Sequence, residues 1–254
     1  IIGGLIHQGH PASQIEVVAP WAEAREALRK NYGIEAQAEA GPALQRAQIV
    51  AWAVKPQTFR DAAAQAKAHT QGALHLSVAA GIRSDSIAQW LGTERIVRTM
   101  PNTPALVGKG MSALYARPAV SAPGRQGIEA IMATTGEFLW VDSEPQLDAV
   151  TALSGSGPAY VFYFLEAMTR AGPGMGLTEQ QAHQLAVGTF VGASELARRS
   201  DDPPSVLRQR VTSKGGTTYA ALQSMEAAGV AASFEAAMRA AQHRAHELGD
   251  EFGA

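Results

Sequence analysis

The sequence predicts an α/β protein of the Rossmann-like type, in which a doubly wound parallel sheet is followed by an all-α domain. Two observations support this prediction. Up to Asp142, short and nearly continuous apolar runs alternate with amphipathic helical patterns, which is typical of parallel strands covered on both faces. Beyond Asp142 the β-branched runs end and long helical patterns follow. We therefore expect one domain over residues 1–142 and a second over residues 143–254.

Apolar runs mark the strands of the first domain. They are "IEVV" (15–18), "QIVAWAV" (48–54), "ALHLSVAA" (73–80), "RIVRTM" (95–100), "GMSALYA" (110–116) and "EFLWVD" (137–142). A helix beginning near Ser121, with Pro123 in its first turn, joins the last two. The opening residues have the pattern of the second half of a helix that ends at Gly9. Because the fold places a strand and a glycine-rich turn before that helix, we expect both to be missing from this chain.

The second domain is expected to contain three long helical stretches, over 158–171, 178–199 and from Thr217 to the C-terminus, with an interruption near Gly229. Their apolar faces are broad, above all in "AYVFYFLEAM" (159–168). Such faces exceed what a small helical domain leaves in water. The pattern therefore predicts self-association.

The composition excludes several classes of function. Of the 254 residues 46% are hydrophobic and 17% charged, and the net charge is −2, so we expect no nucleic-acid partner. The chain has no cysteine, which excludes disulfides, thiolate nucleophiles and cysteine-ligated zinc. No apolar run approaches the roughly 18 residues of a membrane helix. We expect a cytoplasmic protein with no membrane partner.

Ligands of doubly wound sheets bind beyond the carboxyl ends of the strands. Three such ends carry candidate residues: Lys55 and Pro56; Ala79, Ala80 and Gly81; and Met100, Pro101 and Asn102. A lysine can face a phosphate, small residues let a flat ring approach the backbone, and a rigid proline loop can present the amide of Asn102. A solvated lysine and simple strand-to-helix packing remain alternatives for the first two.

The end of the "IEVV" run bears on the choice of cofactor. NAD-binding folds usually place an acidic residue there for the ribose hydroxyls, whereas this chain has Ala19. The missing acid removes the repulsion against a 2′-phosphate, so NADP is the easier fit. No arginine stands immediately beside Ala19 in the sequence, and Arg25 lies a turn into the following helix.

Two other patterns are weighed and set aside. "LSGSGPAY" (153–160) lacks the G-x-S-x-G spacing of a hydrolase serine, and a helix N-terminus with Pro158 in its first turn is the better reading. His243 and His246 have no third ligand nearby in the sequence, and the same holds for His7 and His10. We therefore expect no metal site.

The loop "VTSKGGTTY" (211–219) carries the clearest signal of the second domain. Its two glycines permit a backbone whose N–H groups converge, and the helix expected from Thr217 directs its positive end to the same place. Such a loop suits a small carboxylate. The P-loop of nucleotide triphosphatases is excluded because Lys214 precedes the glycines. An ordinary turn between helices is the alternative.

Taken in order, "RTMPNTPALVGKGMSALYA", "DAVTALSGSGPAYVFYFLEAM" and "VTSKGGTTYAAL" resemble the pyrroline-5-carboxylate reductases. The resemblance implies reduction of 1-pyrroline-5-carboxylate to proline by NADPH or NADH. It implies that N–H groups at Ser213, Gly215, Gly216 and Thr217 receive the substrate carboxylate. It also implies a catalytic role for Thr218, whose hydroxyl would bond the ring nitrogen, and places Glu144 beside the substrate.

The resemblance also assigns cofactor contacts and an assembly. The ribose and nicotinamide contacts are Ala53, Val54, Lys55, Pro56, Ala79, Ala80, Gly81, Met100, Pro101 and Asn102. Ala19 and Pro20 lie near the adenosine ribose, and Arg210 approaches the cofactor. The helical part is a dimerisation domain that interlocks with that of a second subunit. A homodimer results, and dimers can join into a decamer.

Two alternatives stand beside this reading. One is a related NAD(P)-dependent reductase of another cyclic imine or of a hydroxy acid. The other is a truncated, catalytically silent helical assembly module that keeps an anion pocket, and the expected absence of the first strand and glycine-rich turn favours it.

Overall fold

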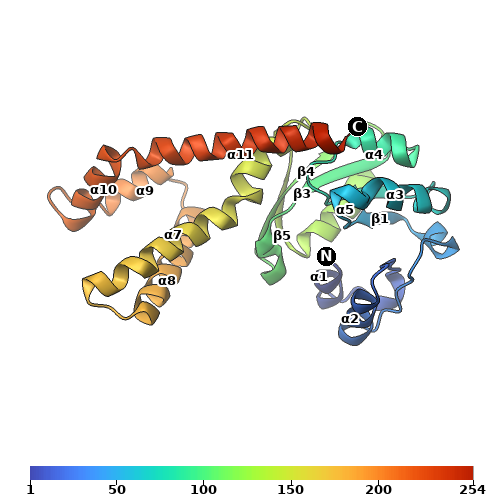
Figure 1. Ribbon diagram of the computed structural model, residues 1–254, viewed down its shortest axis with the longest axis horizontal. Helices are drawn as coiled ribbons and strands as arrows, with labels where there is room; N and C mark the ends of the chain where they lie inside the picture. The colour runs from blue at the N-terminus through green and yellow to red at the C-terminus, as the bar shows by residue number, and fades with distance from the viewer. Residues whose placement is uncertain (254) are drawn as a thin grey trace. The chain divides into compact units, whose positions relative to one another are not determined.

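The computed structural model describes residues 1–253, which divide into two compact units (Figure 1). The first unit contains residues 1–156 and the C-terminal residues from Ala241 onward. The second contains residues 157–240. The first is an α/β unit and the second is entirely helical, as the sequence predicts.

A five-stranded sheet forms the centre of the first unit. Its strands are β1 (Ile49–Trp52), β2 (Leu74–Ser77), β3 (Ile96–Met100), β4 (Gly110–Ala116) and β5 (Gly136–Trp140), in the spatial order β1-β2-β3-β4-β5. The pairs β1–β2, β2–β3 and β4–β5 are parallel, whereas β4 is antiparallel to β3. The change of direction arises because a short connection containing one 3-10 turn, Thr103–Val107, returns the chain beside β3.

The first predicted strand is not formed as a strand. The "IEVV" run contributes one parallel bridge, from Val18 to Gln37, on either side of helix α2 (Ala22–Tyr32). A strand needs a neighbour along its whole length to satisfy its backbone groups, and residues 1–253 offer this run only that single bridge. The run, helix α2 and the segment at Gln37 still follow the order of a β-α-β unit, in which the two outer segments are parallel.

Helices cover the sheet. They are α3 (Pro56–Ala66), α4 (Ser84–Leu91), α5 (Ala122–Ala133), α6 (Gln146–Val150) and the end of α11 (Val230–Phe252). Helix α1 (Ile2–His7) lies instead beside Tyr32 of α2 and Thr134 at the end of α5. Gly9 follows α1 with a φ of 89°, and the Ser121 hydroxyl caps α5 by accepting from the Gly124 N–H at 3.2 Å. Both predicted helix boundaries are therefore confirmed.

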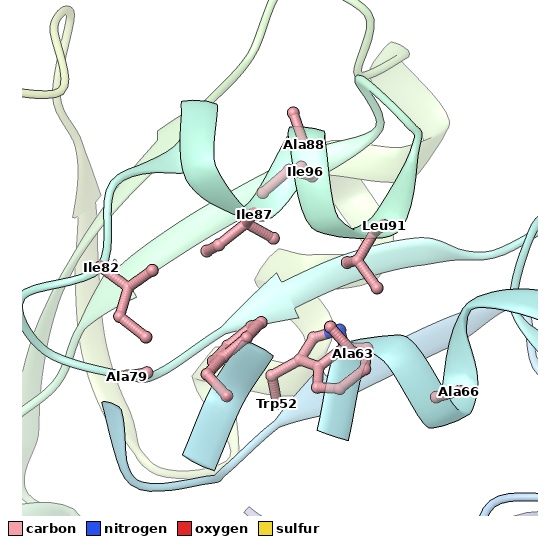
Figure 2. Packing of buried hydrophobic residues seen from close by; sticks show 10 residues of the cluster. Trp52, Ala63, Ala66, Ala79, Ile82, Ile87, Ala88, Leu91 and Ile96 are labelled. Atoms are coloured by element: carbon pink, nitrogen blue, oxygen red, sulfur yellow. The ribbon is translucent and has the colours of Figure 1, made fainter. Parts of the chain in front are cut away.

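Two apolar clusters hold this unit together. In the first, Ile87 and Leu91 project from α4 toward Trp52 and Ala63 (Figure 2). The second joins strand residues such as Leu76 and Leu114 to α5 through its residues Ile128 and Met132. Burying a large apolar side chain contributes about 1.5–3 kcal/mol. The two clusters contain different helices, as expected for a doubly wound sheet.

His75 is a buried polar residue within β2, with 1% of its surface exposed. The Trp52 indole Nε1 donates to His75 Nδ1 at 2.9 Å. Burial lowers the pKa of His75 from 6.5 to about 4, because the protonated ring would lose its hydration. The histidine is therefore neutral in the folded protein at physiological pH.

The free energy of unfolding is expected to fall as the pH drops from 6.5 to 4. In this window the unfolded chain binds a proton at His75 and the folded chain does not, so acid favours unfolding by up to roughly 3 kcal/mol. Denaturant titrations across this range should show a shallower pH dependence for His75→Gln than for the parent. His243→Gln, the same change at an exposed site, should keep the parent slope, and equal slopes for all three proteins would contradict the assignment.

The second unit contains α7 (Gly157–Ala171), α8 (Glu179–Arg199), α9 (Pro204–Arg210), α10 (Thr217–Ala227) and the beginning of α11. Thr178 and Gln181 form a capping box that fixes the start of α8. Phe234 of α11 packs edge-on against Tyr160 and Phe164 of α7, with ring centroids 5.4 and 5.9 Å away. No helix within residues 1–253 combines the length and apolarity that crossing a membrane requires.

Large apolar side chains of α7 and α8 remain exposed in the single chain. Phe162, Tyr163, Leu185, Val191 and Leu196 are each between 58% and 69% exposed. The broad apolar faces read from the sequence are thus present on the folded surface. Patches of this kind mark surfaces that another protein covers.

Candidate functional site

The carboxyl ends of three strands meet at one edge of the sheet. Because β1, β2 and β3 are parallel, and their register aligns Trp52 with Ser77 and Ser77 with Arg98, the segments that follow them leave the sheet at the same edge. These segments contain the predicted cofactor residues 53–56, 79–81 and 100–102. The sheet thus brings the three groups to one region, as expected for a doubly wound fold.

Lys55 follows β1 and occupies the N-cap position of α3, with Pro56 in the first turn. Its carbonyl accepts from the N–H of Thr58 at 3.0 Å, which fixes the turn. The side chain is exposed and forms no ion pair with any residue in 1–253. A free ammonium at a helix N-terminus suits an anion.

The three small residues after β2 have different surroundings. Ala79 is 5% exposed and belongs to the apolar core, whereas Ala80 is exposed. Gly81 has a φ of +74°, and a Cβ there would lie 3.2 Å from the Cβ of Leu248 in α11. Close packing of α11 explains the glycine, so only Ala80 presents a small side chain to solvent.

Asn102 follows β3, and its side-chain amide forms hydrogen bonds within the first unit. The Oδ1 atom accepts from the Met111 N–H at 2.9 Å, and Nδ2 lies 3.2 Å from Ser154 Oγ. Ser154 belongs to a π-helical turn, Thr151–Gly155, which precedes α7. The Asn102 amide therefore ties the loop after β3 to Met111 and Ser154, and its contact with a cofactor stays a prediction.

Arg25 lies close to the predicted adenosine position. Its Nη1 atom donates to the carbonyl oxygens of Ala19 and Pro20, both at 2.8 Å. The sequence places Arg25 a turn away from Ala19, and the first turn of α2 folds it back onto the end of the "IEVV" run. The structure thus brings a guanidinium to the place where the sequence shows none.

Glu144 anchors a buried polar cluster. Its Oε1 atom lies 2.5 Å from Arg98 Nη1 and accepts from the Ser84 N–H at 2.6 Å, and Oε2 accepts from Ser84 Oγ at 2.5 Å. The Arg98 and Glu144 side chains are 9% and 16% exposed. Arg117 donates to Ser84 Oγ at 3.0 Å. Both carboxylate oxygens are therefore occupied by the protein, and Glu144 caps the start of α4.

The sequence reading did not identify Arg98, Ser84 and Arg117 as part of a site. A signal for Arg98 was present, since an arginine in the middle of an apolar strand must meet a buried carboxylate. No comparable signal marked Ser84, because its partner is sixty positions away in the sequence.

The loop before α10 has the predicted form. Gly215 has a φ of +75°, Gly216 is the N-cap residue, and α10 begins at Thr217. The Gly216 N–H donates to Ser213 O at 3.0 Å and is therefore already used. Within residues 1–253, no acceptor meets the N–H groups of Ser213, Gly215, Thr217 and Thr218.

Side chains around this loop are mostly exposed. Thr218 is partly buried, and within the described residues its hydroxyl has no hydrogen-bond partner. Arg210, at the end of α9, forms an ion pair with Asp202 at 2.5 Å and is 61% exposed. The loop therefore offers free main-chain donors and one free hydroxyl at a helix N-terminus, which together can hold a small anion.

Two protein-family models match the chain. The model described as pyrroline-5-carboxylate reductase dimerisation matches residues 144–248. The model described as NADP oxidoreductase, coenzyme F420-dependent, matches residues 1–81.

Relatives and solved structures agree with these matches. The pyrroline-5-carboxylate reductase of Pseudomonas aeruginosa is 43% identical over 100% of this chain and 93% of its own length. That of Haemophilus influenzae is 38% identical over 98% of this chain and 92% of its own. The solved structure from Coxiella burnetii has a TM-score of 0.91 at 34% identity, covering 97% of this chain and 93% of that one. That of the Plasmodium falciparum enzyme, which has NADP bound, has a TM-score of 0.79 at 28% identity, covering 86% and 84%. The chain belongs to the pyrroline-5-carboxylate reductase family.

Proposed function

We propose that the chain reduces 1-pyrroline-5-carboxylate to L-proline with NADPH or NADH, a step of proline biosynthesis. The observation that carries the proposal is the loop before α10, where unpaired N–H groups and the Thr218 hydroxyl stand together at a helix N-terminus. A cyclic imine with one carboxylate offers an acceptor for both kinds of donor: the carboxylate for the N–H groups, and the ring nitrogen for the hydroxyl. Family membership supplies the choice of substrate.

The substrate carboxylate is assigned to the main-chain donors of Ser213, Gly215 and Thr217. The Gly216 N–H already donates to the Ser213 carbonyl, so Gly216 is proposed to contribute by shaping the backbone of the loop around the carboxylate. Several N–H groups converging on one anion give strong, short hydrogen bonds without a charged side chain. The carboxylate fixes the orientation of the ring.

Thr218 is the proposed catalytic residue. Its hydroxyl hydrogen-bonds the ring nitrogen, and a proton on that nitrogen makes the adjacent carbon more electrophilic. NAD(P)H supplies a hydride to that carbon when it is bound. The chain contributes mainly by holding the ring in place, and orientation of this kind can lower a barrier by about 7–11 kcal/mol in favourable cases.

The cofactor residues fit a dinucleotide at the edge of the sheet. Lys55 offers a free ammonium there, Ala80 a small exposed side chain, and Arg25 a guanidinium beside Ala19 and Pro20. We propose contacts from 53–56, 79–81 and 100–102 to the ribose and nicotinamide, from Ala19 and Pro20 to the adenosine, and from Arg210 to the cofactor. Glu144 is proposed to act beside the substrate by holding α4 and Arg98.

The proposed assembly is a homodimer in which the exposed apolar faces of α7 and α8 meet those of a second copy. Support comes from the exposure of these faces and from the family model that matches them. We propose that residues 1–142 act as the nucleotide domain and 143–254 as the dimerisation and substrate domain. Assembly of dimers into a decamer and a cytoplasmic location complete the proposal.

An assay of the purified full chain tests the proposed reaction. Pyrroline-5-carboxylate, piperideine-carboxylate and a series of hydroxy acids would be offered with each reduced or oxidised nucleotide, and proline would be identified by mass spectrometry. We expect turnover with pyrroline-5-carboxylate and reduced cofactor. Greater turnover of a hydroxy acid would favour the related dehydrogenase, and no turnover of any compound would favour a silent assembly module.

A further inference from the structure

The end of the "IEVV" run carries a cation that the proposed reaction does not use. Arg25 reaches back from α2, and its Nη1 donates to the carbonyls of Ala19 and Pro20 at 2.8 Å each. Two carbonyls on one nitrogen hold the guanidinium beside the turn that joins the run to the helix. Since an arginine carries five N–H groups, three remain for another partner.

No carboxylate neutralises this guanidinium within residues 1–253. Arg29, one turn further along α2, does have a carboxylate partner. Its Nη2 donates to both carboxylate oxygens of Glu26, at 2.7 and 2.9 Å. Glu16 is paired with Arg46, and Glu23 is the exposed acid in the first turn of α2. Of the two arginines in α2, Arg25 is the one that no carboxylate in residues 1–253 neutralises.

The surroundings of Arg25 suit a phosphorylated adenosine. A parallel bridge joins Val18 to Gln37 across α2, so the turn at Ala19 lies at the carboxyl end of a strand-like segment. In dinucleotide-binding folds an acid at this place bonds the ribose 2′-hydroxyl, and an arginine accommodates a 2′-phosphate. Trp21 follows directly and is 73% exposed, so an aromatic surface is available in the same turn.

We infer that Arg25 recognises the 2′-phosphate of NADP(H), and so determines the preference of the protein for NADPH over NADH. The inference rests on the proposed function, because it assumes that the sheet binds a dinucleotide. The guanidinium fork matches the geometry of a phosphate, and the two backbone carbonyls orient it before the ligand arrives. NADH has only a hydroxyl at this position and gains little from the charge.

Calorimetric titration of the full chain with NADPH and with NADH tests the inference. For Arg25→Ala the Kd of NADPH is expected to rise about 10- to 100-fold, which corresponds to losing charge-assisted hydrogen bonds, while the Kd of NADH stays unchanged within error. Arg25→Lys keeps the charge but not the fork and should give a smaller rise. Arg29→Ala is the matched control and should change neither Kd.

The results distinguish a failure of the inference from a failure of the proposed function. If Arg25→Ala weakens both nucleotides equally, the residue only holds the turn, and the inference falls while the proposed function stands. If it weakens neither, the inference falls in the same way. If the parent protein binds neither nucleotide, the proposed function fails and the inference fails with it.

Discussion

Thr218→Val is expected to lower kcat/KM for pyrroline-5-carboxylate by about 100-fold, because it removes the proposed hydrogen bond to the ring nitrogen while keeping the size of the side chain. The loss should lie mainly in kcat, since the main-chain donors that hold the carboxylate remain. Steady-state kinetics at saturating NADPH, with a thermal unfolding curve for each protein, measure the effect.

Two companion variants make this result specific. Thr218→Ser restores the hydroxyl and should recover most of the activity. Thr212→Val makes the same change in the same loop, but its hydroxyl donates to the Arg208 carbonyl at 2.6 Å, so kcat/KM should stay near the parent value. A Thr218→Val protein that retains the parent kcat/KM would remove Thr218 from the mechanism.

Glu144→Ala is expected to lower the free energy of unfolding by about 3–5 kcal/mol, the usual cost of removing one member of a buried ion pair. The Arg98 guanidinium, 9% exposed, would be left without its carboxylate, and the Ser84 N–H would lose its cap. Chemical denaturation followed by circular dichroism measures the loss.

Glu94→Ala is the matched control, since it removes an acid that is 60% exposed from its pair with Arg117. A change below about 1 kcal/mol is expected there. The double variant Arg98→Met with Glu144→Leu replaces the pair by apolar side chains and should recover much of the stability. If Glu144→Ala and Glu94→Ala cost the same, Glu144 does not serve as a structural anchor.

The strands and helices could be predicted because their signals are local. Each of β1 to β5 falls on an apolar run, and α5 begins where Ser121 and Pro123 predict it. The "IEVV" run shows the limit of such signals. Its composition is that of a strand, but strand formation depends on a neighbour, and in residues 1–253 it has one bridge to Gln37.

The loop before α10 was predictable for the same reason as the strands. Two adjacent glycines at the start of a helical pattern report a backbone property, and Gly215 indeed has a positive φ. What Asn102 and Glu144 contact was not predictable. Their partners, Ser154 and Ser84, are 52 and 60 positions away, and nothing in a local pattern says which distant group will satisfy a polar side chain.

The packing at Gly81 also determines which fragments of the chain can keep the fold of the first unit. Leu248 of α11 lies against this glycine, Arg83 pairs with Asp250 at 2.6 Å, and the Ser86 hydroxyl donates to the Gly253 carbonyl at 2.8 Å. The sheet unit is thus assembled from two separate stretches of sequence. A recombinant fragment that stops after β5 would lose both Glu144 and this terminal helix, so a fragment that keeps the packing of the first unit requires residues 241–253 to be rejoined to the first 156 through an artificial linker.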